Sequence, residues 1–169
     1  MNSPRLAVSA CLLVATLAGC ASTAPERSSV QAEEATNRET FVRYLEGVWN
    51  EGSYDLIPEL VRPQSVLFAN GQRYEADLAQ HRRVVEVWHE AFPDFRFHID
   101  RVMAEGDRVY ARLRYTGTHS APWFGIPATG REIEVAEMLE CRFVEGKIAE
   151  CWETYDEAGM RRQLGLEEL

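Results

Sequence analysis

The first strong periodicity in the chain is helical. Apolar residues recur at the i, i+3, i+4, i+7 and i+8 spacing of an amphipathic helix, and they are Phe41, Tyr44, Leu45, Val48 and Trp49. A capping-box pattern over residues 36–39 predicts that this helix begins there. A short helix is expected over residues 54–61 and a strand over residues 65–70. Another helix is expected from an N-cap at Asp77 to Phe92, where Pro93 ends it.

From Asp94 onward the apolar period changes to two. Alternating residues predict four long antiparallel strands within residues 95–103, 109–115, 131–143 and 147–155. Helices come first and a strand meander follows, so we predict an α+β domain in which helices pack on one face of a curved sheet.

The N-terminus predicts an exported lipoprotein. Residues 6–17 are a mostly apolar run of about a dozen residues, which suits a signal peptide and is too short for a membrane span of roughly 20. The following Leu-Ala-Gly-Cys resembles a bacterial lipobox, in which Cys20 is lipidated after residues 1–19 are removed. The alternative is a secretory signal with an incidental cysteine. With no aspartate after Cys20, the expected location is the periplasmic face of the outer membrane in a bacterium with two membranes.

Behind the anchor we expect two regions. Residues 20–36 lack an apolar face and are interpreted as a lipidated, disordered tether, and residues 37–169 as one domain. The chain carries 27 acidic and 18 basic side chains, a formal net charge of −9. Such a charge repels phosphate backbones, so nucleic acid is not an expected partner.

Several short motifs resemble the SnoaL-like polyketide cyclase, or ester cyclase, family. They are Ala91-Phe92-Pro93-Asp94, Glu105-Gly106-Asp107-Arg108-Val109, Gly117-Thr118-His119, Phe124-Gly125-Ile126-Pro127-Ala128-Thr129-Gly130-Arg131, Arg142-Phe143, Gly146-Lys147-Ile148, and the closing Trp152, Asp156 and Gln163-Leu164-Gly165. The resemblance covers about residues 39–165.

This resemblance implies the cone-shaped fold of the nuclear transport factor 2 and ketosteroid isomerase superfamily, with an antiparallel sheet wrapped around N-terminal helices. It also implies a homodimer, expected through the outer face of the sheet. In such cyclases one aspartate is the general acid and base of a cofactor-free ring closure, and by position that role falls to Asp156. The sequence departs from the family at Asn70, near which relatives commonly carry a histidine.

Three further residues are candidates for acid/base chemistry. His119 shares the strand parity of Tyr115, so it is either a pocket acid/base or a histidine that orders the loop after it. Glu137 lies on an otherwise apolar strand face, where burial would raise its pKa; a bulge would instead turn it to solvent. Glu150 has the parity of Ile148 and Trp152 and faces inward if they do.

Aromatic residues are numerous enough either to line a cavity or to fill it. The candidates for ligand contact are Trp49, Phe68, Tyr115, Trp123, Phe124 and Trp152. Trp123 and Phe124 lie in a Gly/Pro-rich loop and suit a lid over a pocket. His81 lies on the packed stripe of its helix and is interpreted as a core histidine bonded to a backbone carbonyl.

Two functional hypotheses from different classes follow. The first is cofactor-free cyclisation, isomerisation or dehydration of a small, apolar, carbonyl-containing ligand. The second is a non-catalytic lipoprotein that holds a lipid or metabolite in the same pocket or binds a partner. The sequence has no metal-ligand spacing and no phosphate-binding loop, so neither a metal nor another cofactor is expected.

Cys141 and Cys151 lie on the two arms of a predicted two-residue hairpin turn, Glu145-Gly146. An unbroken register then places Cys141 opposite Glu150 and turns Cys151 to the other face, so the pair is predicted to stay unbridged. A register shifted by one residue would set the two cysteines opposite each other, where they could bond.

Overall fold

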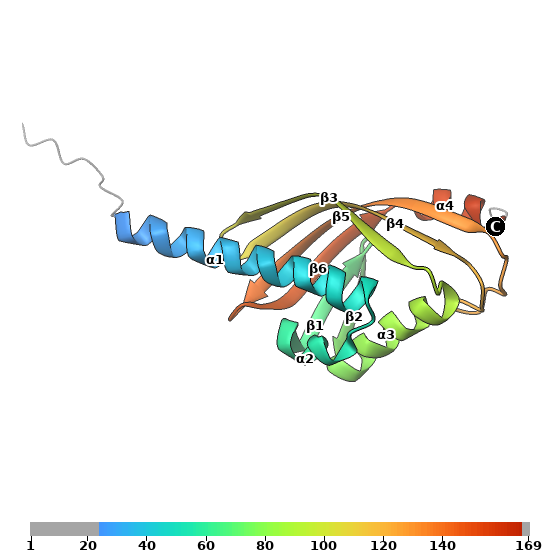
Figure 1. Cartoon of the computed structure of the whole chain (residues 1–169), viewed down its shortest axis with the longest axis horizontal. Helices are drawn as coiled ribbons and strands as arrows, with labels where there is room; N and C mark the ends of the chain where they lie inside the picture. The colour runs from blue at the N-terminus through green and yellow to red at the C-terminus, as the bar shows by residue number, and fades with distance from the viewer. Residues whose placement is uncertain (1–23, 167–169) are drawn as a thin grey trace, which may run out of the picture.

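The computed structural model describes residues 24–166 (Figure 1). The elements in chain order are helix α1 (Ala24–Arg43), the π-helical turn η1 (Tyr44–Asn50), the 3-10 turn η2 (Tyr54–Leu56), helix α2 (Ile57–Leu60), strands β1 (Val61–Ala69) and β2 (Gln72–Asp77), helix α3 (Leu78–Ala91), strands β3 (Arg96–Glu105), β4 (Arg108–Thr118), β5 (Glu132–Val144) and β6 (Lys147–Tyr155), and helix α4 (Glu157–Gln163).

The strands form one sheet in the order β2-β1-β6-β5-β4-β3. The α+β class is confirmed, but the sheet is mixed rather than wholly antiparallel, because β6 returns to lie parallel to β1. Strand β2 was not expected. It forms because Asn70 and Gly71 both adopt positive φ, at 45° and 84°, and close a tight hairpin of the kind that Asn-Gly favours.

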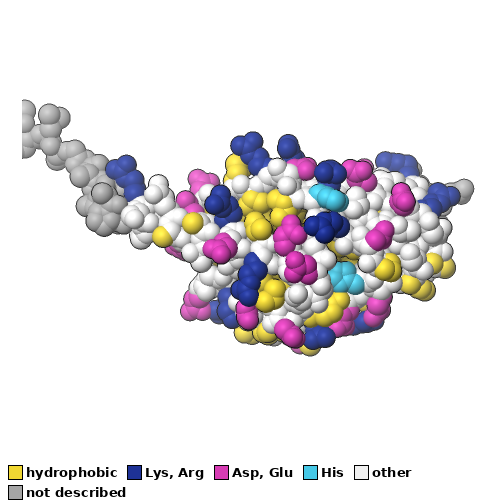
Figure 2. Space-filling view, in the orientation of Figure 1, with side chains coloured by type: hydrophobic (Ala, Val, Ile, Leu, Met, Phe, Trp, Pro, Cys, Tyr) yellow, Lys and Arg dark blue, Asp and Glu magenta, His cyan; other side chains and the backbone are white. Residues whose placement is uncertain are grey.

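The sheet curves over the helices, with α1, η1 and α3 on its concave side (Figure 1). Phe41, Leu45 and Val48 from this layer are fully buried against Val109 and Leu113 of β4. The predicted parity of β4 is therefore confirmed. The predicted helical stripe is buried except at Trp49, which is partly buried, and its second half, residues 44–50, is π-helical rather than α-helical. On the surface of the face drawn in Figure 1, basic and acidic side chains are interspersed, and no region carries charges of a single sign (Figure 2).

Helix α1 corrects the predicted tether. The helix begins at Ala24, so residues 24–35 are helical rather than disordered, and Thr36 lies inside the helix instead of capping it. Its Oγ1 donates to the carbonyl of Ala32, one turn back. Ala, Glu, Gln and Arg are strong helix formers, and each added residue extends an existing helix by one hydrogen bond. The proposed signal peptide and Cys20 lie outside the described residues.

Candidate active site

The centre of the candidate site is a carboxyl group on the concave face of β5. Along this strand the inward positions are Ile133, Val135, Glu137, Leu139, Cys141 and Phe143. No bulge interrupts the register there, since Glu137 lies opposite Leu113 of β4 and Tyr155 of β6. Its side chain is only 5% exposed. The predicted inward placement of Glu137 is confirmed.

A second carboxyl, from Glu153 of β6, reaches the same face. Glu153 lies opposite Leu139, one inward pair away from Glu137 and Tyr155. Residues in such a diagonal relation on neighbouring strands are about 7–8 Å apart at their Cα atoms, which is within reach of long side chains. Two acids therefore share one part of an apolar interior.

The predicted inward placement of Glu150 is wrong. Strand β6 bulges between Ile148, which faces Phe143, and Glu150, which faces Arg142. The bulge leaves Ala149 without an opposite residue and reverses the parity of everything after it. Glu150 consequently lies on the outer face, where it accepts a hydrogen bond from Arg142 Nε at 2.9 Å that lowers the pKa of its carboxyl.

The same bulge corrects the cysteine prediction. The two-residue turn is present, with Glu145 and Gly146 both at positive φ. The bulge behind it places Cys141 opposite Cys151, and the two form a disulfide.

The environment of the acid pair favours protonated carboxyls. Burial, followed by the negative charge of Glu153, raises the pKa of Glu137 well above its usual range, and burial raises that of Glu153 to about 7. Glu137 Oε1 is buried and has no hydrogen-bond partner among the described residues. Ionising both carboxyls would place two negative charges in one apolar region, so the pair favours a state in which one carboxyl keeps its proton.

Three tyrosines lie around the two acids and respond to their charge. Burial raises the pKa of Tyr44 and Tyr115, and raises that of Tyr155 to about 12, with the nearby glutamates adding to each increase. These phenols therefore stay protonated and can donate hydrogen bonds. Tyr44 lies 2.7 Å from Nε2 of His81, whose pKa burial lowers to about 4. His81 thus pairs with a hydroxyl rather than with the predicted backbone carbonyl.

His119 is a buried histidine that bonds to the end of the loop after it and does not meet the acid pair. It is fully buried at the end of β4, its ring stacks on Phe92 at 5.0 Å, and Nδ1 lies 3.1 Å from Thr129 Oγ1. Nε2 has no partner among the described residues, and burial lowers the pKa of the ring. Leu113, which lies opposite Glu137, is six positions before His119. Six positions of strand span about 20 Å.

The two loop aromatics differ from each other. Trp123 packs inward, and its ring centroid lies 4.9 Å from that of Trp88 and 6.0 Å from that of Phe92. Its indole nitrogen is buried and has no hydrogen-bond partner in the part of the chain that the structure describes. Phe124 lies at the tip of the turn, 66% exposed and at a φ of 42°. The loop covers the aromatic end of the interior through Trp123 alone.

Three of the other predicted ligand contacts lie elsewhere. Trp49 is partly buried, packs against Phe95 and Phe97 and hydrogen bonds to Tyr44, so it contacts the site only through that phenol. Phe68 and Trp152 stack face to face at 5.3 Å on the outer side of the sheet, because the bulge reverses the parity of Trp152. Tyr115 is the only one of these predicted strand aromatics that lies beside the acids.

Asp156, to which the family resemblance assigns catalysis, is exposed at the N-cap of α4. Its Oδ1 accepts a hydrogen bond from Gly159 N at 2.8 Å. This is an ordinary helix-capping contact, and it satisfies a backbone donor that the helix itself cannot. The structure does not bring Asp156 together with Glu137.

Sequence reasoning missed Glu153, Tyr155 and Tyr44 as site residues. The alternative register for the cysteines contained the missing signal, because pairing Cys141 with Cys151 fixes the parity of Glu153 and Tyr155 two and four residues later. Tyr44 was assigned to the core stripe, and nothing in its spacing distinguishes a site phenol from a packing one.

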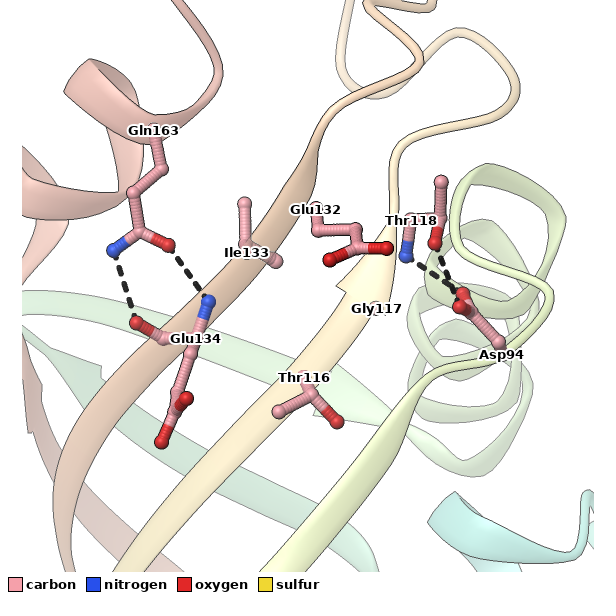
Figure 3. Close-up of a pocket in the computed structure, with 8 residues that line it drawn as sticks. All are labelled: Asp94, Thr116, Gly117, Thr118, Glu132, Ile133, Glu134 and Gln163. Atoms are coloured by element: carbon pink, nitrogen blue, oxygen red, sulfur yellow. Dashed lines mark hydrogen bonds between the residues drawn. The ribbon is translucent and has the colours of Figure 1, made fainter.

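A polar hollow of about 350 Å³ opens at the far end of β4 and β5 (Figure 3). Gln163 of α4 pairs with the backbone of Glu134, donating to its carbonyl at 2.9 Å and accepting from its N–H at 2.7 Å. Asp94 similarly accepts from the N–H and hydroxyl of Thr118. The Gln163 bonds cover the edge of β5 where β6 has ended, and the Asp94 bonds hold the end of β4, so these lining residues serve the fold.

Two features are absent from the described part of the chain. Within residues 24–166, no three or more His, Cys, Asp or Glu side chains come together to hold a metal ion. No helix there is both long enough and apolar enough to span a bilayer.

Comparisons with known proteins agree on one family. Residues 39–164 match the family model for SnoaL-like polyketide cyclases. Among solved structures, a protein of Jannaschia sp. CCS1 assigned as a SnoaL-like polyketide cyclase has a TM-score of 0.72 at 24% identity, covering 80% of this chain and 95% of that one.

Two Streptomyces proteins are also similar. IdmH of Streptomyces antibioticus, assigned as a polyketide cyclase, is 28% identical with a TM-score of 0.66 and covers 76% of this chain and 98% of that one. TsrD of Streptomyces laurentii is 26% identical with a TM-score of 0.70, and the match covers 79% of this chain and 97% of TsrD. No curated protein matches. The family match spans most of the chain and the concave sheet is the family's fold, so this protein belongs to the SnoaL-like polyketide cyclase family.

Proposed function

We propose that the protein catalyses a cofactor-free proton transfer on a small, apolar ligand that contains a carbonyl group. The reaction is a cyclisation, isomerisation or dehydration. One observation carries this proposal: two carboxyls, Glu137 and Glu153, occupy adjacent inward positions of an otherwise apolar sheet face, and one oxygen of Glu137 has no hydrogen-bond partner within residues 24–166. Family membership supplies the expectation of a small-molecule ligand.

The acid pair can supply both partners of such a reaction. The ionised carboxyl removes a proton from the carbon next to the carbonyl, and the protonated one gives its proton to the carbonyl oxygen. Afterwards the proton on the base returns to the acid within the pair, so no proton is gained or lost. Tyr115 and Tyr155, both protonated, can hydrogen bond to the oxygen as it gains charge.

The test uses an aryl methyl ketone as probe, because the lining is aromatic, and follows deuterium exchange at its α-carbon by NMR. Glu137→Gln and Glu153→Gln should each slow enzyme-dependent exchange by about 10²–10⁴. Glu150→Gln is the matched control, since that carboxyl lies on the outer face, and it should exchange at the parental rate. Equal rates in all four proteins would exclude the acid pair.

A non-catalytic holding role is the second candidate. A row of aromatic contacts favours it, running from Trp123 through Trp88 and Tyr115 to Tyr155 with ring-centroid separations of 4.9, 5.7 and 6.5 Å. Saturable binding of the ketone with no exchange above background, in parent and variants alike, would support this role instead.

Membrane attachment through Cys20 is part of the proposal. The lipobox pattern supports it, and the Cys141–Cys151 disulfide suits an oxidising compartment such as the envelope. Cells fed a labelled fatty acid should label the parent and not Cys20→Ser, and the parent should fractionate with the outer membrane in a host with two membranes. Labelling of both proteins would refute the anchor.

We also propose a homodimer through the outer face of the sheet. Met103 and Met138 on β3 and β5 are 53% and 59% exposed there, and a second copy would cover them. Light scattering should give twice the chain mass, and Met138→Glu should shift it toward the single-chain value. A single-chain mass for the parent at high micromolar concentration would refute the dimer.

A further inference from the structure

The β5–β6 hairpin has two possible registers, and they present different residues to the interior. Without the bulge, the pairing of Phe143 with Ile148 would continue to place Cys141 opposite Glu150 and Leu139 opposite Trp152. Glu153 would then point outward. With the bulge at Ala149, Cys141 lies opposite Cys151 and Glu153 points inward.

The observed register carries a cost. It leaves Ala149 unpaired in the ladder and buries the carboxyl of Glu153 beside that of Glu137. On the outer face it gains the Arg142–Glu150 ion pair and the Phe68–Trp152 stack. Partly exposed ion pairs and ring stacks of this kind stabilise a register only weakly. A disulfide, in contrast, cannot form at all in the unbulged register because its two cysteines face opposite sides.

We propose that the Cys141–Cys151 disulfide is the positioning element for Glu153: it locks β6 into the bulged register and thereby holds the second carboxyl of the site inside the sheet. Its catalytic consequence rests on the proposed function, whereas the register does not.

Protonation of Glu153 provides a readout that needs no substrate. The groups that face it are Glu137 on β5, Tyr44 on η1, Tyr115 on β4 and Tyr155 on β6, with His81 of α3 behind Tyr44. Because the pKa of Glu153 is raised in the folded protein, the folded state binds its proton more tightly than the unfolded chain does. This contribution to stability is present at low pH and is lost as the pH rises toward 7, at about tenfold in the unfolding constant per pH unit.

The decisive variant moves the bond by one residue. Glu150→Cys combined with Cys151→Ser can form a disulfide to Cys141 only in the unbulged register. All chains are full length with Cys11→Ser and Cys20→Ser, so that no other thiol is counted. We expect no free thiol, a cross-link to position 150 in the peptide map, and a pH slope of stability about tenfold per unit shallower than in the parent, equal to that of Glu153→Gln.

Glu150→Ser alone is the control, since it loses the ion pair with Arg142 and keeps the native disulfide; its pH slope should match the parent. A folded double variant with two free thiols, or one that is cross-linked at position 150 and still has the parental slope, would overturn the proposal.

A second pair of variants tests the same point without a cross-link. Cys141→Ser with Cys151→Ser should show the shallow slope of Glu153→Gln. Deleting Ala149 in that background removes the bulge while keeping residue 151 opposite 141, so it should restore the parental slope. A serine pair with the full parental slope, or a folded deletion variant without it, would refute the positioning role.

The ketone-exchange assay separates this inference from the proposed function. A variant with the shallow slope and undiminished exchange would refute the role of Glu153 in catalysis and leave the register inference standing. If Glu153→Gln loses exchange with its disulfide intact while the bond-shifted variant keeps the parental slope, the result is the opposite. The catalytic role of Glu153 then stands and the register inference is refuted.

Discussion

At the scale of single residues, the concave face of the sheet changes what a carboxyl group does. Glu150 and Glu153 are three positions apart on β6, yet the pKa of Glu150 is lowered by Arg142 on the outer face, whereas burial raises that of Glu153. The same type of side chain is thus a surface ion-pair partner in one place and a carboxyl that keeps its proton to a higher pH in the other.

The pH dependence of stability should show this difference. Glu153→Gln removes an acid whose pKa is about 7 when folded and 4.5 in its ordinary state. Between these values the parent loses at most about 1.4 kcal/mol of unfolding free energy per pH unit from this group. Urea unfolding at pH 4.5 to 7.5 should therefore give the variant a flatter profile and, at pH 7.5, higher stability. Parallel profiles would contradict the raised pKa.

At the scale of elements, helix α4 depends on the residue that precedes it. Asp156 caps it, and the helix buries Met160 and Leu164 against the sheet. Asp156→Ala should lower the free energy of unfolding by about 0.5–2 kcal/mol, whereas Asp156→Asn should preserve it, since asparagine caps equally well. Thermal denaturation of both variants checks this.

The same two variants test the role that family resemblance assigns to Asp156. If Glu137 and Glu153 carry the chemistry, Asp156→Asn exchanges the probe ketone at the parental rate. A stable Asp156→Asn protein with exchange slowed by about 10²–10⁴ would return the catalytic role to this aspartate.

Periodicity could predict β4 and β5, because one buried face imposes strict alternation and Glu137 lies within an unbroken run of it. It could not predict Ala149 as a bulge, since the extra residue carries no unusual side chain and its effect appears only in the pairing with β5. Strand β2 was missed for a related reason: residues 72–77 are polar or exposed on both faces, so they have no alternation to detect.

The helical content of residues 24–35 was missed because these residues have almost no apolar face, and amphipathicity was the criterion. Two hydrogen bonds to Gly106, in the turn between β3 and β4, hold this part of α1 against the sheet. Glu34 accepts from the N–H of Gly106 at 2.9 Å, and Asn37 donates to its carbonyl at 3.4 Å. Neither can be anticipated from spacing, because the partner lies about seventy residues away.

At the scale of the whole molecule, α1 extends beyond the sheet, and residues 27–33 are exposed along it (Figure 1). The ten residues before Glu34 amount to about 15 Å of helix. With the lipid that we propose at Cys20, this helical stretch would restrict the distance between domain and membrane more than a random coil of the same number of residues. The concave face that we propose as the catalytic site would then stay near the bilayer, and apolar molecules dissolved in that bilayer would meet it at a high effective concentration.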